Sequence, residues 1–549
     1  MLTSRIEQLK KQFFTHVPAV CLEGALSKTH VFKETEGEPM IVRRAKAFKR
    51  HCETKTITIQ PGELVVGNAG RIARTIHICP ELSNNWVYEE LDTMATRPQD
   101  PYAITEEQKM LFRNEIYPYW KGKTLRDYWN AQAPKPILDI ISVGGVIDND
   151  IKIECTPGDI VPEFKENIFA KGFGGIRAQA QALLETVDLN DVENYDRRDF
   201  WEAITITCDG FSILCRRHAQ AARELAATER DGTRKAELLG IAEACDAIAE
   251  NPPKTFREAM QLHYFIFVGL FIEGNAGGYS PGRMDQNLYP YYKRDVEAGI
   301  LTDADALELI ECMWIKFGEQ IWYWNEPAAT HYAGFCAFQN VCIGGVDMDG
   351  LDAVNPLSYL MLQATIDTQM VQPSLSVRLS RKNPEDFFLK IAELIQTGSG
   401  FPAIYSDDIG MKQLMKKGIP PELARDWVGL GCVEANMPGK MSQWSSAGHY
   451  NIAAAVEFAL SNGVHLKSGK SSALKPAIRH PSRPLNSSAT RCTPSSITCS
   501  APSPVCRTCW NSCTSATCPT PWPRWSSSIA WKRERISCAA GRATTPGPA

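Results

Sequence analysis

The sequence predicts an α/β fold in which a helical N-terminal part precedes a parallel sheet or barrel. Before Gln339, apolar residues recur at helical spacing in several segments, whereas after it short apolar strands alternate with helices. Strands connected in this way run parallel, with the crossover helices packed outside them. The composition of residues 466–549 differs from that of residues 1–465, and this difference separates a folded body from a tail.

The N-terminal part is predicted to be helical. Its expected helices cover residues 4–14, 39–52, 106–120, 199–228, 234–249, 255–272 and 302–317. Thr255 and Glu258 have the spacing of a capping box, which opens a very apolar helix. Residues 57–59 and 64–66 flank Pro61-Gly62 and predict a strand-turn-strand unit.

The second part of the body predicts the sheet. Strands are expected at residues 340–346, 374–379 and 401–405, and helices at residues 356–368, 384–397 and 420–427. This βαβαβα order predicts parallel strands but does not fix how many there are.

The composition is that of an ordinary globular protein. The chain has 549 residues, of which 44% are hydrophobic and 22% charged. With a net charge of −4, it lacks the excess of basic residues that is typical of nucleic-acid-binding proteins. Its start, MLTSRIEQLKKQFF, does not resemble a signal peptide, and its longest apolar run, residues 265–272, is too short to span a bilayer. We therefore expect a cytoplasmic protein without nucleic-acid or membrane partners.

One segment, WVGLGCVEANMPGKMSQWSSAGHY (residues 427–450), is the candidate active site. Gly429 and Gly431 permit a tight turn beside a single thiol, Cys432, and the carboxylate of Glu434 follows two residues later. We expect the thiol on a loop at the end of a buried strand, where α/β folds carry their catalytic groups. The alternatives are an inert buried thiol at Cys432 and a surface carboxylate at Glu434.

This segment resembles the cysteine loop of the glycyl radical enzymes, the pyruvate formate-lyase superfamily. The residues that carry the resemblance are Gly431-Cys432-Val433-Glu434, Pro438-Gly439-Lys440, Trp444, and the segments GELVVG (62–67), SPGRMDQ (280–286), YPYY (289–292) and PSLSV (373–377). The chain is similar to the branch that holds the B12-independent glycerol and propanediol dehydratases, choline trimethylamine-lyase and trans-4-hydroxyproline dehydratase. The resemblance implies a ten-stranded α/β barrel surrounded by helices, of which residues 1–465 form the N-terminal portion.

The resemblance also implies a radical mechanism. Cys432 would carry a thiyl radical that abstracts hydrogen from a small organic substrate, and Glu434 would be the general base that helps a neighbouring group to leave. The radical is stored on a glycine by a separate radical-SAM activating enzyme, so no bound cofactor and no metal are expected, and intact members form homodimers. A radical decarboxylase, a C-acyltransferase and a non-catalytic remnant that binds a small molecule remain alternatives.

Further residues are candidates for binding the substrate, although each could equally be structural. They are Glu154, Gly277, Gly278, Trp322, Ser446 and His449. Gly277 and Gly278 stand where the similar diol dehydratases have a His-Ser pair, which predicts a wider and less polar pocket than one for glycerol. Arg283 and Asp285 are expected to form a structural ion pair.

The tail is predicted to be a non-native, out-of-frame segment. Residues 466–549 are rich in Ser, Pro, Cys and Arg, and no glycine loop of the RVAGY type occurs in the sequence, so a C-terminal glycyl radical domain is expected to be absent. A back-translation of residues 525–549, shifted by one nucleotide, reads approximately as VVDCMEKGKDILRGGARNYTGP, which resembles the next part of the family. We expect the tail to be disordered and interpret the zinc-like spacing of Cys506, Cys509, Cys513 and Cys518 as accidental. Resequencing of the DNA that follows the codon for Val464 tests this interpretation.

Overall fold

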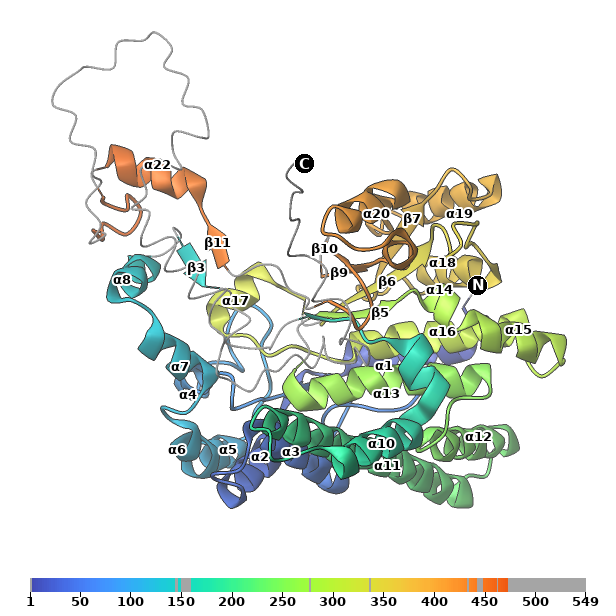
Figure 1. Ribbon diagram of the computed structural model, residues 1–549, viewed down its shortest axis with the longest axis horizontal. Helices are drawn as coiled ribbons and strands as arrows, with labels where there is room; N and C mark the ends of the chain where they lie inside the picture. The colour runs from blue at the N-terminus through green and yellow to red at the C-terminus, as the bar shows by residue number, and fades with distance from the viewer. Residues whose placement is uncertain are drawn as a thin grey trace, which may run out of the picture.

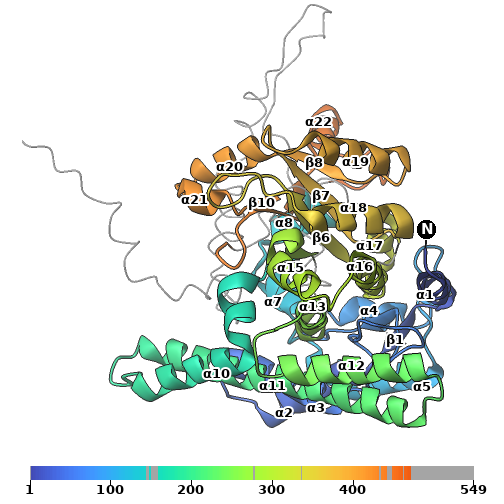
Figure 2. The same ribbon diagram turned by 90° about the vertical axis from the view of Figure 1, so that its right-hand side faces the viewer.

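A layer of helices and a layer containing a parallel sheet make up the body of the protein (Figures 1 and 2). Two helices, α13 (Phe256–Gly274) and α16 (Asp303–Gly318), run between these layers. The computed structural model describes residues 2–143, 147–149, 159–275, 278–334, 337–431, 434–441, 448–461 and 463–471. From residue 472 onward, the predicted tail lies outside the described residues.

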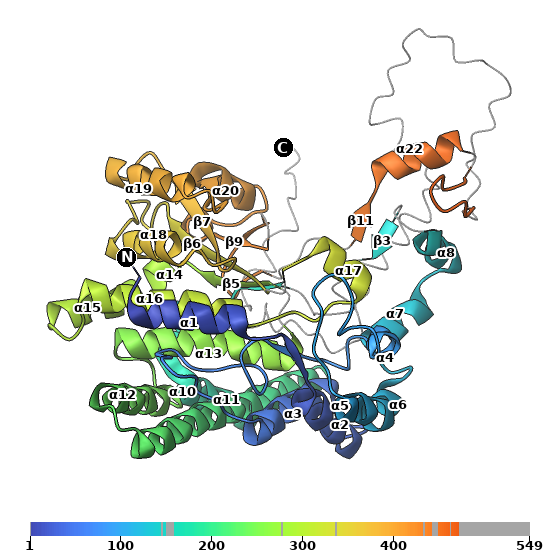
Figure 3. The ribbon, with the colours of Figure 1, turned by 180° about the vertical axis from the view of Figure 1, so that it is seen from behind.

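The N-terminal part is helical, as predicted. Its helices are α1 (Ser4–Thr15), α2 (Glu23–Glu34), α3 (Met40–Thr54), α4 (Asn85–Glu90), α5 (Glu106–Leu111), α6 (Tyr117–Trp120), α7 (Leu125–Gln132), α8 (Lys135–Val143), α10 (Phe169–Thr186), α11 (Asn194–Thr228) and α12 (Gly232–Ile248), with π-helical turns η1 (Phe112–Ile116) and η2 (Phe164–Ile168). Two short parallel strands, β1 (Ala19–Cys21) and β2 (Thr75–His77), pair with each other. Figure 3 shows α1 alongside α16, above α13. None of the described helices is both long and apolar enough to cross a membrane.

The strand-turn-strand unit predicted at residues 57–66 is wrong, because this segment bonds to side chains rather than to a partner strand. The backbone N–H and C=O of Val66 bond the amide group of the buried Gln261 at 3.0 and 2.8 Å. Glu63 accepts a hydrogen bond from Lys316 Nζ at 2.6 Å in the interior. Side chains of α13 and α16 thus satisfy the polar groups of this segment.

Five parallel strands form the sheet, in the order β4-β5-β6-β7-β8. They are β4 (Asp159–Ile160), β5 (Gly278–Gly282), β6 (Phe338–Gly344), β7 (Ser374–Leu379) and β8 (Ala403–Ser406). The last three confirm the predicted strands, and α18 (Pro356–Thr368) and α19 (Glu385–Gln396) confirm the predicted crossover helices between them. β5, with the sequence GYSPG, is not among the predicted strands because glycine and proline disfavour strands.

The remaining elements are short. They are α14 (Met284–Asn287), α15 (Tyr289–Glu297), α17 (Glu326–His331), α20 (Asp407–Met415), α21 (Pro421–Ala424), α22 (Ile452–Leu460) and the strands β3 (Ile147–Asn149), β9 (Val428–Leu430), β10 (Glu434–Asn436) and β11 (Gly448–Tyr450). The helix predicted at residues 420–427 is thus reduced to the single turn of α21.

The two faces of the sheet differ in polarity. On the face covered by helices, strand residues join the main core; they are Tyr279, Val341, Ile343, Leu375 and Val377. Because side chains alternate along a strand, the residues between them point to the opposite face. This inner face comprises Ser280, Asn340, Cys342, Ser376 and Arg378, all of them buried.

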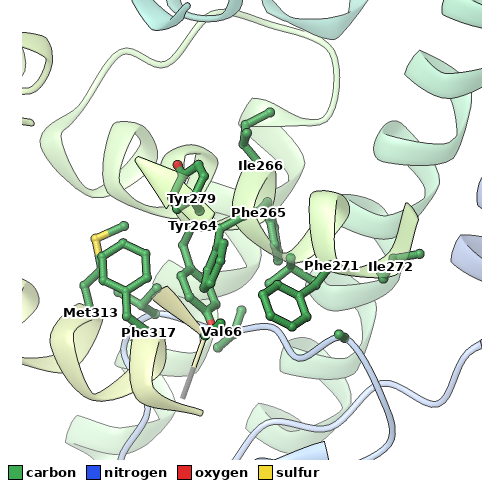
Figure 4. Close-up of a cluster of buried hydrophobic side chains, with 14 of the residues drawn as sticks. Val66, Tyr264, Phe265, Ile266, Phe271, Ile272, Tyr279, Met313 and Phe317 are labelled. Carbon is green, nitrogen blue, oxygen red and sulfur yellow. The ribbon is translucent and has the colours of Figure 1, made fainter. Parts of the chain in front are cut away.

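The largest core surrounds α13 (Figure 4). Thr255 caps this helix by accepting a hydrogen bond from the N–H of Glu258 at 3.2 Å, as predicted. Most residues of α13 are buried on every side, so the helix lacks a solvent face. Aromatic contacts join Phe317 of α16 to Tyr264 of α13 and to Tyr279 of β5, with ring centroids 5.9 and 6.2 Å apart. This core therefore fixes the sheet relative to the helices.

Glu311, buried in α16, makes the stability of the fold depend on pH. Burial, assisted by the charges of Asp367 and Glu308, raises the pKa of Glu311 from 4.5 to about 7. The folded state then holds a proton that the unfolded state releases, so stability falls as the pH rises from 4.5 to 7. We expect Glu311→Gln to be more stable than the wild type at pH 8, by about 1–3 kcal/mol, and equally stable at pH 4. Unfolding curves at both pH values measure this. Glu297→Gln, at an exposed position, is the control, and an equal gain at both pH values would contradict the assignment.

Candidate functional site

The candidate cysteine lies between the two strands of a hairpin. β9 pairs antiparallel with β10, and Glu434 stands opposite Leu430. Gly431, which begins the connection, has φ +53°, a left-handed conformation that glycine adopts without strain. Cys432 itself lies outside the described residues, as do Glu154, Gly277 and Ser446. The residues on either side of Cys432 therefore define the site.

Two side chains of the inner face hold the first strand of this hairpin. The hydroxyl of Ser280 lies 2.8 Å from the carbonyl oxygen of Gly429 and 2.9 Å from that of Asn340. Asn340 Nδ2 donates to the carbonyl oxygen of Gly431 at 3.0 Å. A Cβ atom at Gly429 would lie only 3.1 Å from Asn340 Nδ2, so the absence of a side chain permits the close approach. The bonded carbonyl groups directly precede Cys432 in the chain.

Apolar contacts complete the attachment of β9. Val428 and Leu430 pack with Val161 and Cys342 in a small cluster separate from the main core. All four side chains are buried, three of them completely. The strand is therefore bonded through its backbone and packed through its side chains.

The hairpin enters the inner face from the carboxyl ends of the sheet strands and points toward their amino ends. Trp427, at the start of β9, accepts a hydrogen bond from Arg378 near the carboxyl end of β7. Gly431 is bonded by Asn340, near the amino end of β6. β9 therefore runs antiparallel to the sheet strands. The strand before the thiol is buried, as expected, but Cys432 lies outside the described residues, so its own position stays a prediction.

A buried ion pair fixes the base of the hairpin. Arg378 and Asp407 are both fully buried, and Arg378 Nε donates to Asp407 Oδ1 at 2.8 Å. The guanidinium also donates to the carbonyl oxygen of Trp427 at 2.8 Å, while the indole N–H of Trp427 donates to Asp407 Oδ1 at 2.8 Å. The backbone N–H of Val346 donates to Asp407 Oδ2 at 2.7 Å. Burial lowers the pKa of Arg378 to about 10, which leaves it charged at neutral pH.

Two substrate-binding candidates lie at the amino end of the sheet, toward which the hairpin points. Gly278 is the first residue of β5 and stands opposite Phe338, the first residue of β6. Trp322 is buried; its carbonyl oxygen accepts a hydrogen bond from Tyr102 and its ring meets that of Trp324 edge-on at 4.7 Å. The bond from the N–H of Ala337 to the carbonyl oxygen of Gln320, 3.2 Å, holds this segment beside the start of β6.

The other two described candidates differ in position. Glu434 begins β10 and is half-buried. His449 lies in β11, which pairs antiparallel with β3 through His449 and Asp148. Figures 1 and 3 show β3 and β11 well away from β9 and β10. The structure thus does not bring His449 to the hairpin.

The ion pair predicted between Arg283 and Asp285 is wrong in its partners. Arg283 Nη1 lies 3.4 Å from Asp426 Oδ1, and Arg283 Nη2 donates to the carbonyl oxygen of Gly344 at 2.9 Å. Asp285 accepts from the N–H of Gly344 at 2.9 Å and from the hydroxyl of Ser358 at 2.7 Å. The two side chains hold Gly344 from both sides, so their role is structural. Within the described part of the chain, no group of three or more His, Cys, Asp or Glu residues could hold a metal.

The sequence analysis did not select Ser280, Asn340 or Arg378, the residues that hold the hairpin. A usable signal was present, because each is a polar residue within or next to an apolar strand: GYSPG, NVCIGG and LSVRL. Buried polar side chains require partners, and here the partners are backbone groups of the hairpin.

Comparisons with known proteins agree with this architecture. A family model described as pyruvate formate lyase-like matches residues 2–486. The chain is 34% identical over 475 residues to isethionate sulfite-lyase of Oleidesulfovibrio alaskensis, covering 85% of this chain and 57% of the relative. It is 34% identical to trans-4-hydroxy-L-proline dehydratase of Clostridioides difficile, covering 84% of this chain and 58% of the relative. The chain therefore spans less than two thirds of the length of these relatives.

A solved structure supports the predicted fold class. The glycerol-bound form of the B12-independent glycerol dehydratase from Clostridium butyricum superposes with a TM-score of 0.82 at 35% identity. The match covers 85% of this chain and 59% of that chain. The prediction of an α/β-barrel fold of this type is confirmed, with the five parallel strands β4–β8 as its described part.

The hydroxyl of Ser280 is expected to stabilise the hairpin specifically. Ser280→Ala removes a donor shared by two buried carbonyl groups, which should cost about 1–3 kcal/mol. Hydrogen exchange in a peptide that spans residues 428–436 should become faster than exchange in α13. Ser376→Ala is a matched control, because this hydroxyl is equally buried on the inner face and has no hydrogen-bond partner among the described residues. Equal exchange in both variants would show that Ser280 does not hold the hairpin.

Breaking the buried ion pair is expected to destabilise the whole fold. Arg378→Met leaves the carboxylate of Asp407 buried without its guanidinium, which should cost about 3–5 kcal/mol. Thermal unfolding measures the loss. Lys293→Met breaks the exposed pair of Lys293 with Glu297, 3.9 Å apart, and should change stability little. Similar losses in the two variants would argue against a special role of Arg378.

Proposed function

Because the chain belongs to the pyruvate formate lyase-like family of glycyl radical enzymes, we propose that its intact form is a radical lyase or dehydratase. Such an enzyme abstracts a hydrogen atom from a small organic substrate and eliminates a neighbouring group. The observation that carries the proposal is the hairpin of β9 and β10, whose first strand is bonded to the inner face of the sheet at Gly429 and Gly431, directly before position 432. The names of two relatives also support the proposal, because a sulfite-lyase and a dehydratase both eliminate a group from their substrate.

Cys432 is proposed to take the hydrogen atom. A sulfur-centred radical at this position breaks a C–H bond of the substrate homolytically, so the hydrogen goes to sulfur and the unpaired electron stays on carbon. Glu434 then accepts the proton of a hydroxyl group on that carbon, and the group on the adjacent carbon leaves with its bonding electrons. The product radical recovers the hydrogen atom from the thiol, which restores the starting state of Cys432.

The substrate is proposed to bind beyond the tip of the hairpin, at the amino end of the sheet. Gly278 and Trp322 lie at this end, which supports their assignment together with Gly277. Glu154 and Ser446 are proposed from the resemblance alone. The same proposal for His449 is weakened by the position of β11. Glycines instead of polar side chains favour a substrate that is bulkier or less polar than glycerol.

The glycyl radical would reside on a loop that is not among these 549 residues. No RVAGY-type sequence occurs in the chain, so we propose that this polypeptide alone does not turn over substrate. We also propose that residues 466–549 are a non-native, out-of-frame tail, and that the intact enzyme is a cytoplasmic homodimer activated by a radical-SAM enzyme.

An anaerobic activation experiment tests the proposal. The chain is incubated with a radical-SAM activating enzyme of a related protein and examined by electron paramagnetic resonance. We expect no glycyl doublet from this chain and a doublet once the family's reading frame after Val464 is restored. A doublet from the 549-residue chain would contradict the absence of the glycine loop. Failure of the restored protein to give both a doublet and turnover of any tested diol, hydroxyproline or sulfonate would contradict the lyase proposal.

The two proposed catalytic residues should behave differently on substitution. In the restored protein, Cys432→Ser should abolish turnover while the fold remains intact. Glu434→Gln should still permit exchange of hydrogen between substrate and thiol but slow elimination roughly 10²–10⁴-fold. Deuterium exchange into the substrate and product formation measure these two steps separately. Normal turnover by Glu434→Gln would remove Glu434 from its assigned role.

A further inference from the structure

A partly open apolar cavity lies beside the sheet and adjoins the site described above at Val161. It has a volume of about 210 Å³ and lies between α10, α11 and α13. Its walls include Phe173 and Ile176 of α10, Ile204 and Phe211 of α11, and Ile266 and Leu270 of α13. Val161 and Pro162, which follow β4, close it on the side of the sheet.

Rigid packing forms the cavity. The rings of Phe173 and Phe211 stack in parallel, with centroids 4.5 Å apart and an interplanar angle of 10°. α10 is kinked at Gly172, whose φ is +62°, and a Cβ atom there would lie 2.5 Å from the backbone of Asn251. Only glycine permits this path of α10, so the backbone fixes one wall of the cavity.

The polar groups of Glu163 and Thr207, which line the cavity, already have partners. Glu163 accepts hydrogen bonds from the N–H groups of Glu166 and Asn167, both at 2.9 Å. The hydroxyl of Thr207 donates to the carbonyl oxygen of Ala203 at 2.7 Å. A polar ligand would thus find no free partner among these groups, whereas an apolar ligand would lose none.

Two other lining groups add to this apolar character. Burial raises the pKa of the Cys208 thiol to about 12, so this sulfur is uncharged at neutral pH. The side-chain oxygen of Gln179 accepts a hydrogen bond from Lys171 Nζ at 3.1 Å. Neither of these two lining groups carries a charge, which favours an uncharged ligand.

We propose that this cavity is a binding site for a small apolar molecule of the size of toluene or indole. An engineered apolar cavity of about 150 Å³ stays dry and binds benzene, so a cavity of this size and lining accepts a somewhat larger ring. The proposal is independent of radical chemistry at Cys432, since no residue that lines the cavity is assigned a catalytic role.

The ligand would also contact the chain that leaves the catalytic hairpin. Gly439, three residues after β10, lines the cavity, and its N–H donates to the carbonyl oxygen of Val161 at 2.9 Å. A Cβ atom at Gly439 would lie 2.5 Å from Cβ of Glu163, so the segment packs directly on this wall. Occupation of the cavity should therefore slow hydrogen exchange in residues 437–441.

Binding of toluene and indole to the full chain tests the proposal. Both probes should raise the midpoint of thermal unfolding of the wild type. Ile176→Trp fills the cavity from a half-exposed position and should weaken binding at least ten-fold. Leu389→Trp adds the same side chain at an exposed position of α19 and should leave binding unchanged. Absence of a shift with both probes, or an equal shift in Ile176→Trp, would overturn the proposal.

A second measurement uses the wild-type chain and follows chemical modification of Cys208. Methyl methanethiolsulfonate converts a thiol to a methyl disulfide and releases methanesulfinate, and peptide mass mapping reports this reaction at Cys208. Indole should slow modification of Cys208 at least ten-fold, and by a larger factor than modification of the buried Cys245 of α12, which reports only the general stabilisation of the fold. Equal rates at Cys208 with and without indole would show that the probe binds elsewhere.

Discussion

The buried pair of Arg378 and Asp407 is the constraint on which the proposed site depends. Two unpaired charges at this depth would be very costly, but here each is bonded both to the other and to backbone or indole groups. Through these bonds the pair joins β7, α20, the segment after β6 and the start of β9. The position of the Trp427 carbonyl group is thereby set, and the hairpin extends from that point along the inner face.

The division of polarity within the sheet explains how one sheet can serve both the core and the site. Side chains such as Val341 and Val377 pack against helices, whereas Ser280 and Asn340 on the other face are small enough to admit a second layer of backbone. Large apolar residues at these inner positions would fill the volume that β9 occupies. The polar groups in turn satisfy the carbonyl oxygens of Gly429 and Gly431.

Much of the fold could be predicted from the sequence because its signals are local. Periodicity and capping located α11, α13, α16, α18 and β7 closely, and composition separated the tail from the body. The strands predicted within residues 57–66 are absent. Strand propensity cannot tell whether a segment will hydrogen-bond to a neighbouring strand or to side chains such as Gln261 and Lys316, which lie far away in the sequence. The direction of the hairpin was not predicted. It depends on where Arg378 and Asn340 bond to β9, and such long-range contacts leave no periodic pattern. The thiol and the carboxylate, by contrast, were selected through a motif, and their roles stay predictions.

Because β9 runs antiparallel to the sheet strands, its length determines how far along the inner face position 432 lies. A strand advances about 3.3 Å per residue, and neighbouring side chains face opposite ways. One residue inserted between Trp427 and Gly431 would carry position 432 deeper by that distance and reverse the orientation of every side chain that follows. One residue deleted would withdraw it by the same amount. Relatives that act on substrates of different size can thus be expected to keep the spacing between these two anchoring points constant and to vary the opposite wall.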